Sequence, residues 1–264
     1  MFMRKRLVTV LAAAACFIFS GVGSSFAAGE HIFGLGPEIS YITYEEPGVM
    51  KEQGIMYGIV GSYAYHNKLM LKAEGRGSWG QVDYKNSGTI NNINDYMLEF
   101  RGLGGYDFSL IKASILTPYI GIGYRYLNDD MSGKVSSIGA AGYERESNYL
   151  YSPIGVKFIT DLGNRWSVGT AAEYDIFWWG RQISHFSDVD PGYNDVKNHQ
   201  SSGYGLRGSV ELQKGNFVIK PFVRYWNIKE SKHTDIIYNG EAVGYGYEPR
   251  NHSTEYGINL VIRF

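Results

Sequence analysis

The last eleven residues of the chain, 254–264, alternate between two kinds of side chain. The first set is mainly apolar or aromatic and the second is polar or small at most positions: Thr254, Tyr256, Ile258, Leu260, Ile262 and Phe264 against Glu255, Gly257, Asn259, Val261 and Arg263. A period of two predicts a β-strand with two different faces. Because the apolar face continues to Phe264, we expect this strand to meet lipid, with its backbone paired on both sides in a closed barrel.

The N-terminus has the pattern of an export signal. Three basic residues, 4–6, precede an apolar run over residues 7–19, and small residues follow as far as Ala27. This pattern predicts a Sec-type signal peptide over residues 1–27 and a mature domain over 28–264. The run is shorter than the roughly 20 residues of a membrane-spanning helix, which argues against an N-terminal anchor. The only cysteine, Cys16, lies in the predicted signal, so we expect no disulfide in the mature protein.

Composition excludes several classes of function. Without the three basic residues of the signal, 22 basic side chains face 26 acidic ones, a formal charge of −4. This is not the basic footprint of a nucleic-acid-binding protein, and no motif indicates a cofactor. The chain contains 34 Gly, 22 Tyr and 5 Trp, with no segment that has the pattern of an amphipathic helix, and this favours an all-β protein.

Alternation of the kind seen at the C-terminus recurs along the chain. It predicts about ten strands, with eight to twelve as the possible range; they lie near residues 32–44, 55–65, 69–82, 96–108, 116–127, 149–160, 166–181, 204–212, 217–225 and 254–264. The predicted connections are alternately short, as at 66–68 and 213–216, and long, as at 45–54, 83–95 and 128–148. The sequence therefore predicts a transmembrane, antiparallel, up-and-down β-barrel with both termini in the periplasm.

The two faces of these strands differ in charge. The predicted outward face is apolar and aromatic, whereas the predicted inward face carries Glu38, Lys72, Glu74, Arg76, Glu99, Arg101, Asp107, Arg125, Lys157, Glu173, Asp175, Arg181, Arg207, Glu211, Lys220, Arg224, Glu255 and Arg263. A soluble lipocalin-like barrel would have the opposite arrangement. Since the two signs are nearly balanced, we expect a narrow lumen crossed by ion pairs; a selective channel is the alternative. Tyrosines and tryptophans near strand ends, such as Trp79, Tyr174 and Trp178, are typical of interfacial belts.

Histidine and aspartate residues gather in the predicted loop 184–203. His185 and Asp188, with Asp83 from an earlier loop, are weak candidates for a hydrolytic site, and Asp188, Asp190 and Asp195 are weak candidates for a metal site. The segment around Asp188 and Asp190 lacks the further oxygen ligands and the terminal glutamate of an EF-hand loop. Solvated loops collect such residues without any chemistry, so we assign neither a catalytic residue nor a metal ligand.

The ten-stranded plan and the loop Trp178-Trp-Gly-Arg-Gln-Ile-Ser-His-Phe-Ser-Asp-Val-Asp-Pro-Gly-Tyr193 resemble the omptins, surface proteases of Gram-negative bacteria. The C-terminal Phe264 also resembles the terminal signature that the outer-membrane assembly machinery recognises. The resemblance to omptins implies an Asp-x-His pair in this loop and an Asp-x-Asp pair in the second loop. Here His185 precedes Asp188 by three residues, and the second loop offers only Asp83 and Asp95. The resemblance therefore implies the omptin scaffold without the omptin catalytic motifs.

Three functions remain open on this basis. We expect a monomeric, non-enzymatic barrel in the bacterial outer membrane, whose partners are membrane lipid, lipopolysaccharide, the assembly machinery and an extracellular ligand or host surface. The first alternative is an omptin-like protease with a rearranged site built from His185, Asp188 and Asp83. The second alternative is a small porin or channel.

Overall fold

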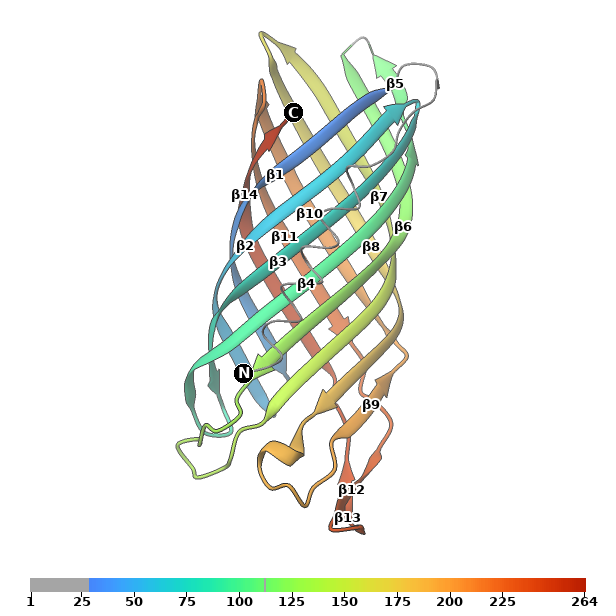
Figure 1. The fold of residues 1–264 in the computed structure, drawn as a ribbon. Coiled ribbons are helices and arrows are strands. Elements are labelled where there is room, and N and C mark those ends of the chain that lie inside the picture. The colour runs from blue at the N-terminus through green and yellow to red at the C-terminus, as the bar shows by residue number, and fades with distance from the viewer. Residues whose placement is uncertain (1–28, 112) are drawn as a thin grey trace, which may run out of the picture.

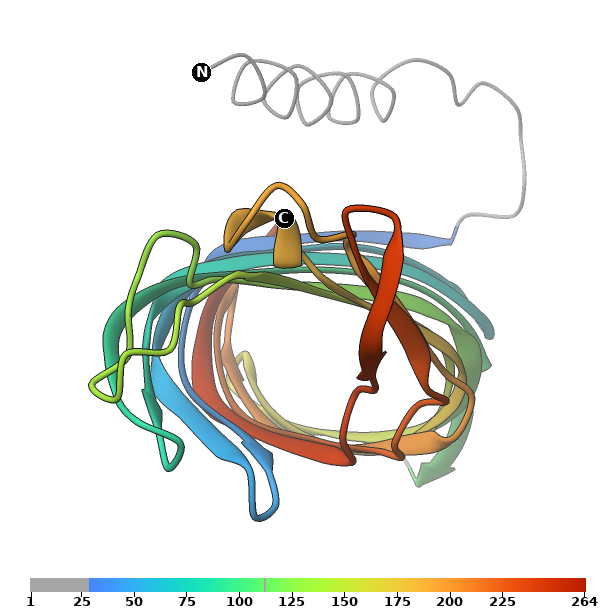
Figure 2. The same ribbon diagram turned by 90° about the horizontal axis from the view of Figure 1, so that it is seen from below.

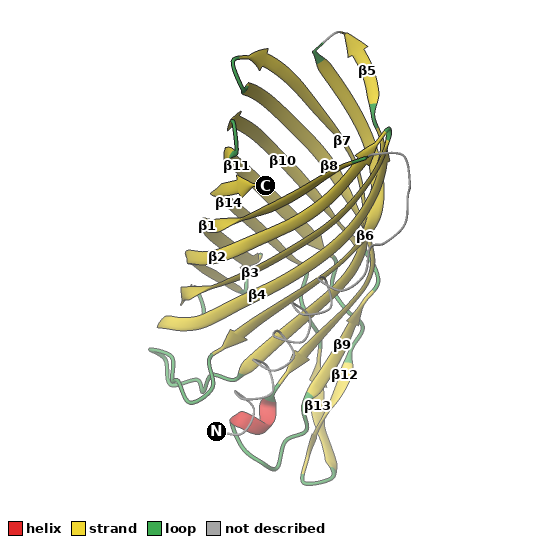
Figure 3. Ribbon diagram, turned by 45° about the horizontal axis from the view of Figure 1, so that its top comes forward, coloured by secondary structure: helices red, strands yellow, loops and turns green. Residues whose placement is uncertain are grey.

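The structure is a computed structural model that describes residues 29–111 and 113–264. Ten long antiparallel strands form a tilted barrel (Figures 1 and 3). They are β1 (Glu30–Glu46), β2 (Met50–Asn67), β3 (Leu69–Lys85), β4 (Ile90–Tyr106), β6 (Ser114–Asp130), β7 (Glu144–Gly163), β8 (Trp166–Ser184), β10 (Gly203–Lys214), β11 (Phe217–Ile228) and β14 (Asn251–Arg263). The predicted signal peptide, residues 1–27, lies outside the described residues. No helix among the described residues is long and apolar enough to cross a membrane.

The barrel is closed, as Figure 2 shows along its axis. The first and last strands pair with each other, with Tyr41 opposite Tyr256, and the amide and carbonyl of Phe33 bond those of Phe264 at 2.9 and 3.0 Å. Each remaining strand pairs with its neighbours along the chain, including β8 with β10. The predicted closed, ten-stranded, antiparallel barrel is confirmed.

The two ends of the barrel are built differently. Short turns connect the strands at one end, where the C-terminus also lies and where the short strand β5 (Phe108–Ile111) extends a hairpin with β6 (Figure 1). The other end carries the 3-10 turn η1 (Phe186–Asp188), β9 (Val196–Gln200) and the hairpin of β12 (Thr234–Tyr238) with β13 (Glu241–Gly246). We call these the short-turn end and the long-loop end.

Two of the predicted long loops, 45–54 and 83–95, are in fact short turns. β1 continues to Glu46 and β2 begins at Met50, while β3 reaches Lys85 and β4 begins at Ile90. Polar residues in these segments broke the apolar alternation on which the prediction depended. They do not interrupt the backbone ladder, since beyond the lipid-facing band either face of a strand can be polar.

The outward face is apolar over the middle band of the barrel. Phe100, Ile120 and Leu260 are among the many large apolar side chains that are exposed there. Aromatic rings form two belts: Phe33, Tyr63 and Phe264 pack together at the short-turn end, and the other belt contains the pairs Tyr41–Tyr256, Tyr96–Tyr126 and Tyr174–Tyr204. This is the distribution expected of a membrane-spanning barrel.

The prediction that Arg181 faces the lumen is wrong. A β-bulge between β7 and β8 leaves Trp178 without a partner, since Tyr151 pairs with Phe177 and Leu150 with Trp179. One extra residue reverses the alternation beyond it. The Arg181 guanidinium therefore lies outside the barrel, 5.8 Å from the ring of exposed Trp179.

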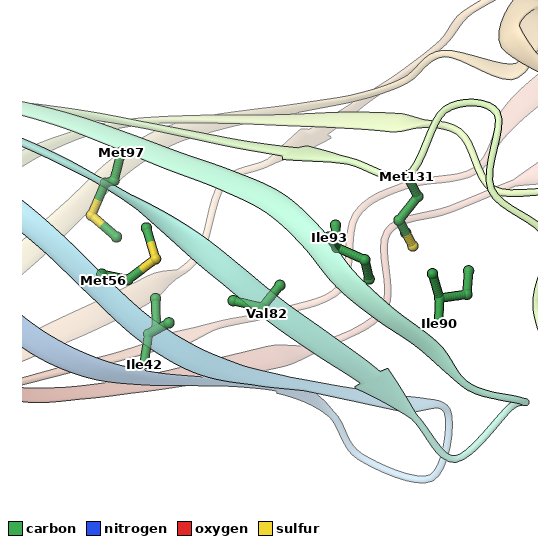
Figure 4. Close-up of a cluster of buried hydrophobic side chains, with 7 residues drawn as sticks. All are labelled: Ile42, Met56, Val82, Ile90, Ile93, Met97 and Met131. Carbon is green, nitrogen blue, oxygen red and sulfur yellow. The ribbon is translucent and has the colours of Figure 1, made fainter.

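The lumen also contains an apolar cluster that the sequence analysis did not identify. Seven buried residues from β1 to β4 and the segment after β6 pack together toward the long-loop end (Figure 4): Ile42, Met56, Val82, Ile90, Ile93, Met97 and Met131. Met56 and Met97 are completely buried. A second cluster, which includes Tyr151, Phe177 and Trp226, covers the wall formed by β7, β8 and β11. The lumen is thus packed with apolar as well as charged side chains.

Candidate functional site

The middle of the lumen is filled by a charged network that contains equal numbers of guanidinium and carboxylate groups. Arg76, Arg101, Arg207 and Arg224 form ion pairs with Glu38, Glu99, Glu173, Asp175 and Glu255. Arg125 lies beside them, and its Nε donates to the sulfur of Met97 at 3.3 Å. We call this set the mid-lumen network.

Arg76 and Arg207 connect opposite walls of the barrel through this network. Arg76 lies 2.7 Å from Glu38, 3.1 Å from Glu99 and 2.8 Å from Glu255. Arg207 lies 2.6 Å from both Glu99 and Asp175.

Aromatic side chains complete the network. The Tyr151 hydroxyl donates to Glu99 at 2.7 Å and accepts from Arg207 at 2.9 Å. The ring of Tyr151 needs a glycine on the neighbouring strand, because a Cβ at Gly123 would lie 2.3 Å from it. Arg125 and Arg207 also lie 5.7 and 5.6 Å from the ring of Trp226. Since ion pairs and rings span the lumen, it has the character of a packed core, in agreement with the predicted narrow, charge-filled interior.

The long-loop end contains a cavity of about 310 Å³. Segments from all five connections at this end line it, and we call it the crown cavity. Its apolar and aromatic lining includes Tyr84, Met131, Tyr143, Phe186 and Tyr247. Since Met131 and Ile90 belong to the buried apolar cluster as well, the cavity ends where that cluster begins.

Acidic side chains outnumber cations at this end. Arg145 lies 2.5 Å from Glu46 and 3.0 Å from Glu248, and the Tyr44 hydroxyl donates to Glu248 at 2.9 Å. Burial raises the pKa of Glu248 to about 6; Arg145 opposes the rise and Glu46 adds to it. Three further buried carboxylates, Glu52, Asp95 and Asp129, have no salt bridge to a described cation.

His185 is held between two carboxylates at the rim of the crown cavity. Its Nδ1 lies 3.0 Å from Asp195 and its Nε2 lies 3.1 Å from Glu146. Partial burial alone would lower the pKa of His185, but the bonds to Asp195 and Glu146 outweigh it and raise the pKa above the usual value. The two carboxylate partners and the raised pKa favour the imidazolium form, which donates from both nitrogens. It has no free lone pair with which to act as a base toward water.

The other candidate residues do not converge on His185. Asp188 accepts a bond from the amide of Glu144 at 2.9 Å, and Asp83 accepts one from the amide of Asn92 at 3.0 Å. Asp190 accepts bonds from the amide of Gly192 at 2.8 Å and the hydroxyl of Tyr238 at 3.4 Å. Each of these carboxylates stabilises a loop.

Asp195 differs from the other acids because it contacts both His185 and Ser187. The Ser187 hydroxyl donates to it at 2.7 Å. Burial would raise the pKa of Asp195, but the bonds from Ser187 and His185 lower it. Among residues 29–111 and 113–264, no group of three His, Cys, Asp or Glu side chains has an arrangement that could hold a metal ion.

Residues 11–203 match the family model described as the outer membrane protein beta-barrel domain. The chain belongs to this family. Members of an outer membrane barrel family reside in the bacterial outer membrane, so the membership places the chain there. No curated protein sequence matches the chain.

Solved structures resemble the chain to different extents. The outer membrane protease OmpT from Escherichia coli has 11% identity and a TM-score of 0.60 over 93% of this chain and 100% of its own. The translocator domain of the autotransporter NalP from Neisseria meningitidis has 11% identity and a TM-score of 0.44 over 99% and 96% of the two chains. The toluene transporter TbuX from Ralstonia pickettii has 9% identity and a TM-score of 0.41 over 90% and 89%. At such identities the likeness to OmpT shows the fold alone, and it confirms the omptin-like barrel predicted from the sequence.

Two residues of the candidate site, Arg145 and Glu146, were not predicted from the sequence. Glu146 and Arg145 are adjacent on β7, yet one contacts His185 outside the barrel wall and the other contacts Glu46 and Glu248 inside. Strand parity could have separated them, had the start of β7 been predicted at Glu144.

Proposed function

We propose that this outer-membrane barrel is a non-enzymatic surface protein that binds an extracellular ligand in the crown cavity. The observation that supports this proposal is the contrast between the middle of the lumen, which the mid-lumen network fills, and the open cavity of about 310 Å³ at the long-loop end. This proposal places the long-loop end outside the cell and both termini in the periplasm, with Phe264 available to the assembly machinery. It also takes the protein to be a monomer, with lipid and lipopolysaccharide around its outward face.

The chemistry of the crown cavity favours a ligand with a cationic group. Aromatic rings of Tyr84, Tyr143 and Tyr247 line a space whose charged groups are Glu46, Glu248 and Arg145. Two carboxylates share one guanidinium, so one negative charge remains above about pH 6. A cation near aromatic faces and carboxylates gains from both.

A dibasic peptide tests this proposal and separates it from the protease alternative. Refolded protein with lipopolysaccharide is titrated with the peptide, and both binding and cleavage are followed. We expect saturable binding without cleavage, and weaker binding after Glu248→Gln. Glu241→Gln is a matched control, since Glu241 lies on the exposed β13.

Two results would contradict the proposal. Cleavage that His185→Ala abolishes would identify an omptin-like hydrolase, although His185 has both nitrogens bonded here. Equal loss of binding in Glu248→Gln and Glu241→Gln would show that the crown cavity is not the binding site.

A further inference from the structure

A second cavity lies in the lumen at the short-turn end, beneath the mid-lumen network. It measures about 340 Å³, and its walls come from strands all around the barrel. Ile32, His66 and Thr117 mark its position, since each lies near the short-turn end of its strand. We call it the basal cavity. It is separated from the crown cavity by Arg76, Glu99 and Arg207, which form its inner limit.

Several cations gather around two of the carboxylates that line the basal cavity. Glu74 lies 2.6 Å from both Lys72 and Arg101, and Arg101 also binds Glu173 of the mid-lumen network. Glu211 lies 2.7 Å from Arg263 and 3.4 Å from Lys157. Each carboxylate is thus shared by two cations.

Lys220 adds a further positive charge. It lines the same cavity from β11, on the inward parity of that strand, and it makes no hydrogen bond or ion pair with a described residue. Lys72, Lys157, Lys220 and Arg263 therefore lie around Glu74 and Glu211. A third carboxylate of the lining, Asp107, is bonded to His66 at 2.7 Å and to Thr117 at 2.5 Å. Glu30, at the mouth, is exposed. Partly enclosed charges that are mostly of one sign, in walls of low polarity, attract a counter-ion strongly.

The same cavity has apolar walls beside these cations. Met70, Leu103, Val218 and Phe222 are buried and line it. Met70 and Val218 stand two positions from Lys72 and Lys220 on their strands, so each ammonium group has an apolar neighbour on the same face. Small-molecule sites combine apolar walls with a few polar groups in this way, and their volumes begin at about 300 Å³.

We propose that the basal cavity binds a small organic anion. Its phosphate or carboxylate head lies against Lys220, Lys72 and Lys157, and its apolar body lies against Met70 and Val218. The ligand enters through the mouth at the short-turn end. This site is independent of ligand binding at the crown, because the mid-lumen network separates the two cavities.

Phenyl phosphate, inorganic phosphate and benzyl alcohol test the two parts of this site. Titration calorimetry is carried out on the barrel in phosphatidylcholine nanodiscs, with empty nanodiscs as the blank. We expect saturable binding of phenyl phosphate, at least about tenfold tighter than the binding of inorganic phosphate or of benzyl alcohol. Inorganic phosphate lacks the apolar ring, and benzyl alcohol lacks the phosphate.

Three variants locate the binding. Lys220→Gln should lower the affinity for phenyl phosphate by about tenfold. Lys220→Arg should retain this affinity to within about threefold, because it keeps the charge. Lys214→Gln is the matched control. Lys214 lies at the same end on β10, with its ammonium 4.8 Å from the ring of Trp166. This variant should bind phenyl phosphate as tightly as the unaltered protein does. Heat-modifiable migration on gels confirms that each variant is folded.

The proposal is overturned if phenyl phosphate shows no saturable binding, or if folded Lys220→Gln binds it as tightly as Lys214→Gln. Equal affinity for phenyl phosphate and inorganic phosphate would contradict the assignment of an organic ligand. None of these results depends on binding at the crown cavity.

Discussion

The middle of the lumen and its long-loop end use similar residues for opposite purposes. In the mid-lumen network four guanidinium groups form ion pairs with five carboxylates, and Arg76 alone contacts three of them. At the long-loop end Arg145 is shared by Glu46 and Glu248, while His185 is held by two more acids. Balanced, buried charge fills the middle of the lumen, whereas the long-loop end has an excess of acidic groups beside a cavity that can hold a ligand.

The largest expected effect comes from unbalancing the mid-lumen network. Arg76→Ala leaves Glu38, Glu99 and Glu255 with fewer cations in a buried setting, and should lower the free energy of unfolding by about 3–5 kcal/mol. Equilibrium unfolding in urea with lipid vesicles measures the change. Arg250→Ala, at an exposed position of the long-loop end, is the control and should have little effect. Equal stability of the two variants would show that the network does not hold the barrel together.

A smaller effect is expected when only one hydroxyl is removed. Tyr151→Phe deprives Glu99 of a donor at 2.7 Å and Arg207 of an acceptor at 2.9 Å, and keeps the ring in place. We expect a loss of about 1–3 kcal/mol in the same unfolding experiment. Tyr174→Phe, on the exposed face, should be close to neutral; if it costs as much as Tyr151→Phe, the network is not the cause.

The contacts of His185 with Asp195 and Glu146 should make the stability of the long-loop end depend on pH, while the stability of the mid-lumen network stays unchanged. Because the folded-state pKa of His185 is raised, its stabilising contribution is complete below the usual pKa of about 6.5 and is lost as the pH rises through the raised value. Hydrogen exchange of residues 186–195 should therefore accelerate from pH 6 to pH 8, after correction for the intrinsic rate. His185→Gln should remove this dependence. Persistence of the dependence in His185→Gln would assign it to another group.

The smallest effect concerns Glu248. Its folded-state pKa of about 6 lies above the usual 4.5, so its contribution to stability is greatest below pH 4.5 and falls as the pH rises to about 6. Glu248→Gln should flatten the dependence of unfolding free energy on pH in this window. Glu241→Gln should leave the slope as it is.

Much of the barrel could be predicted from local alternation, and the exceptions have physical causes. Residues such as Glu38 and Glu99 stand between apolar neighbours, so the face of the strand on which they lie could be predicted. The inward position of Met56 was hidden because Ile55 and Tyr57 are apolar as well. Arg181 was misplaced because a bulge at Trp178 leaves no mark in the alternation of apolar residues.

The candidate site was less accessible because its contacts join distant segments. His185 was identified, but its partners are Asp195, ten residues away, and Glu146, on the neighbouring strand. Asp188 was a plausible partner by spacing, yet the 3-10 turn directs it to the amide of Glu144. Loop geometry determines such pairings, and it does not follow from residue type or spacing.

Single-channel recording in planar bilayers tests most directly whether the lumen is closed. With the mid-lumen network and the apolar cluster of Met56 and Met97 intact, the refolded protein should insert and show no conductance steps. Insertion is verified independently, by heat-modifiable migration of the recovered protein. Reproducible steps of a defined size would mean that ions pass through the network, and would contradict the conclusion that the lumen is a packed core.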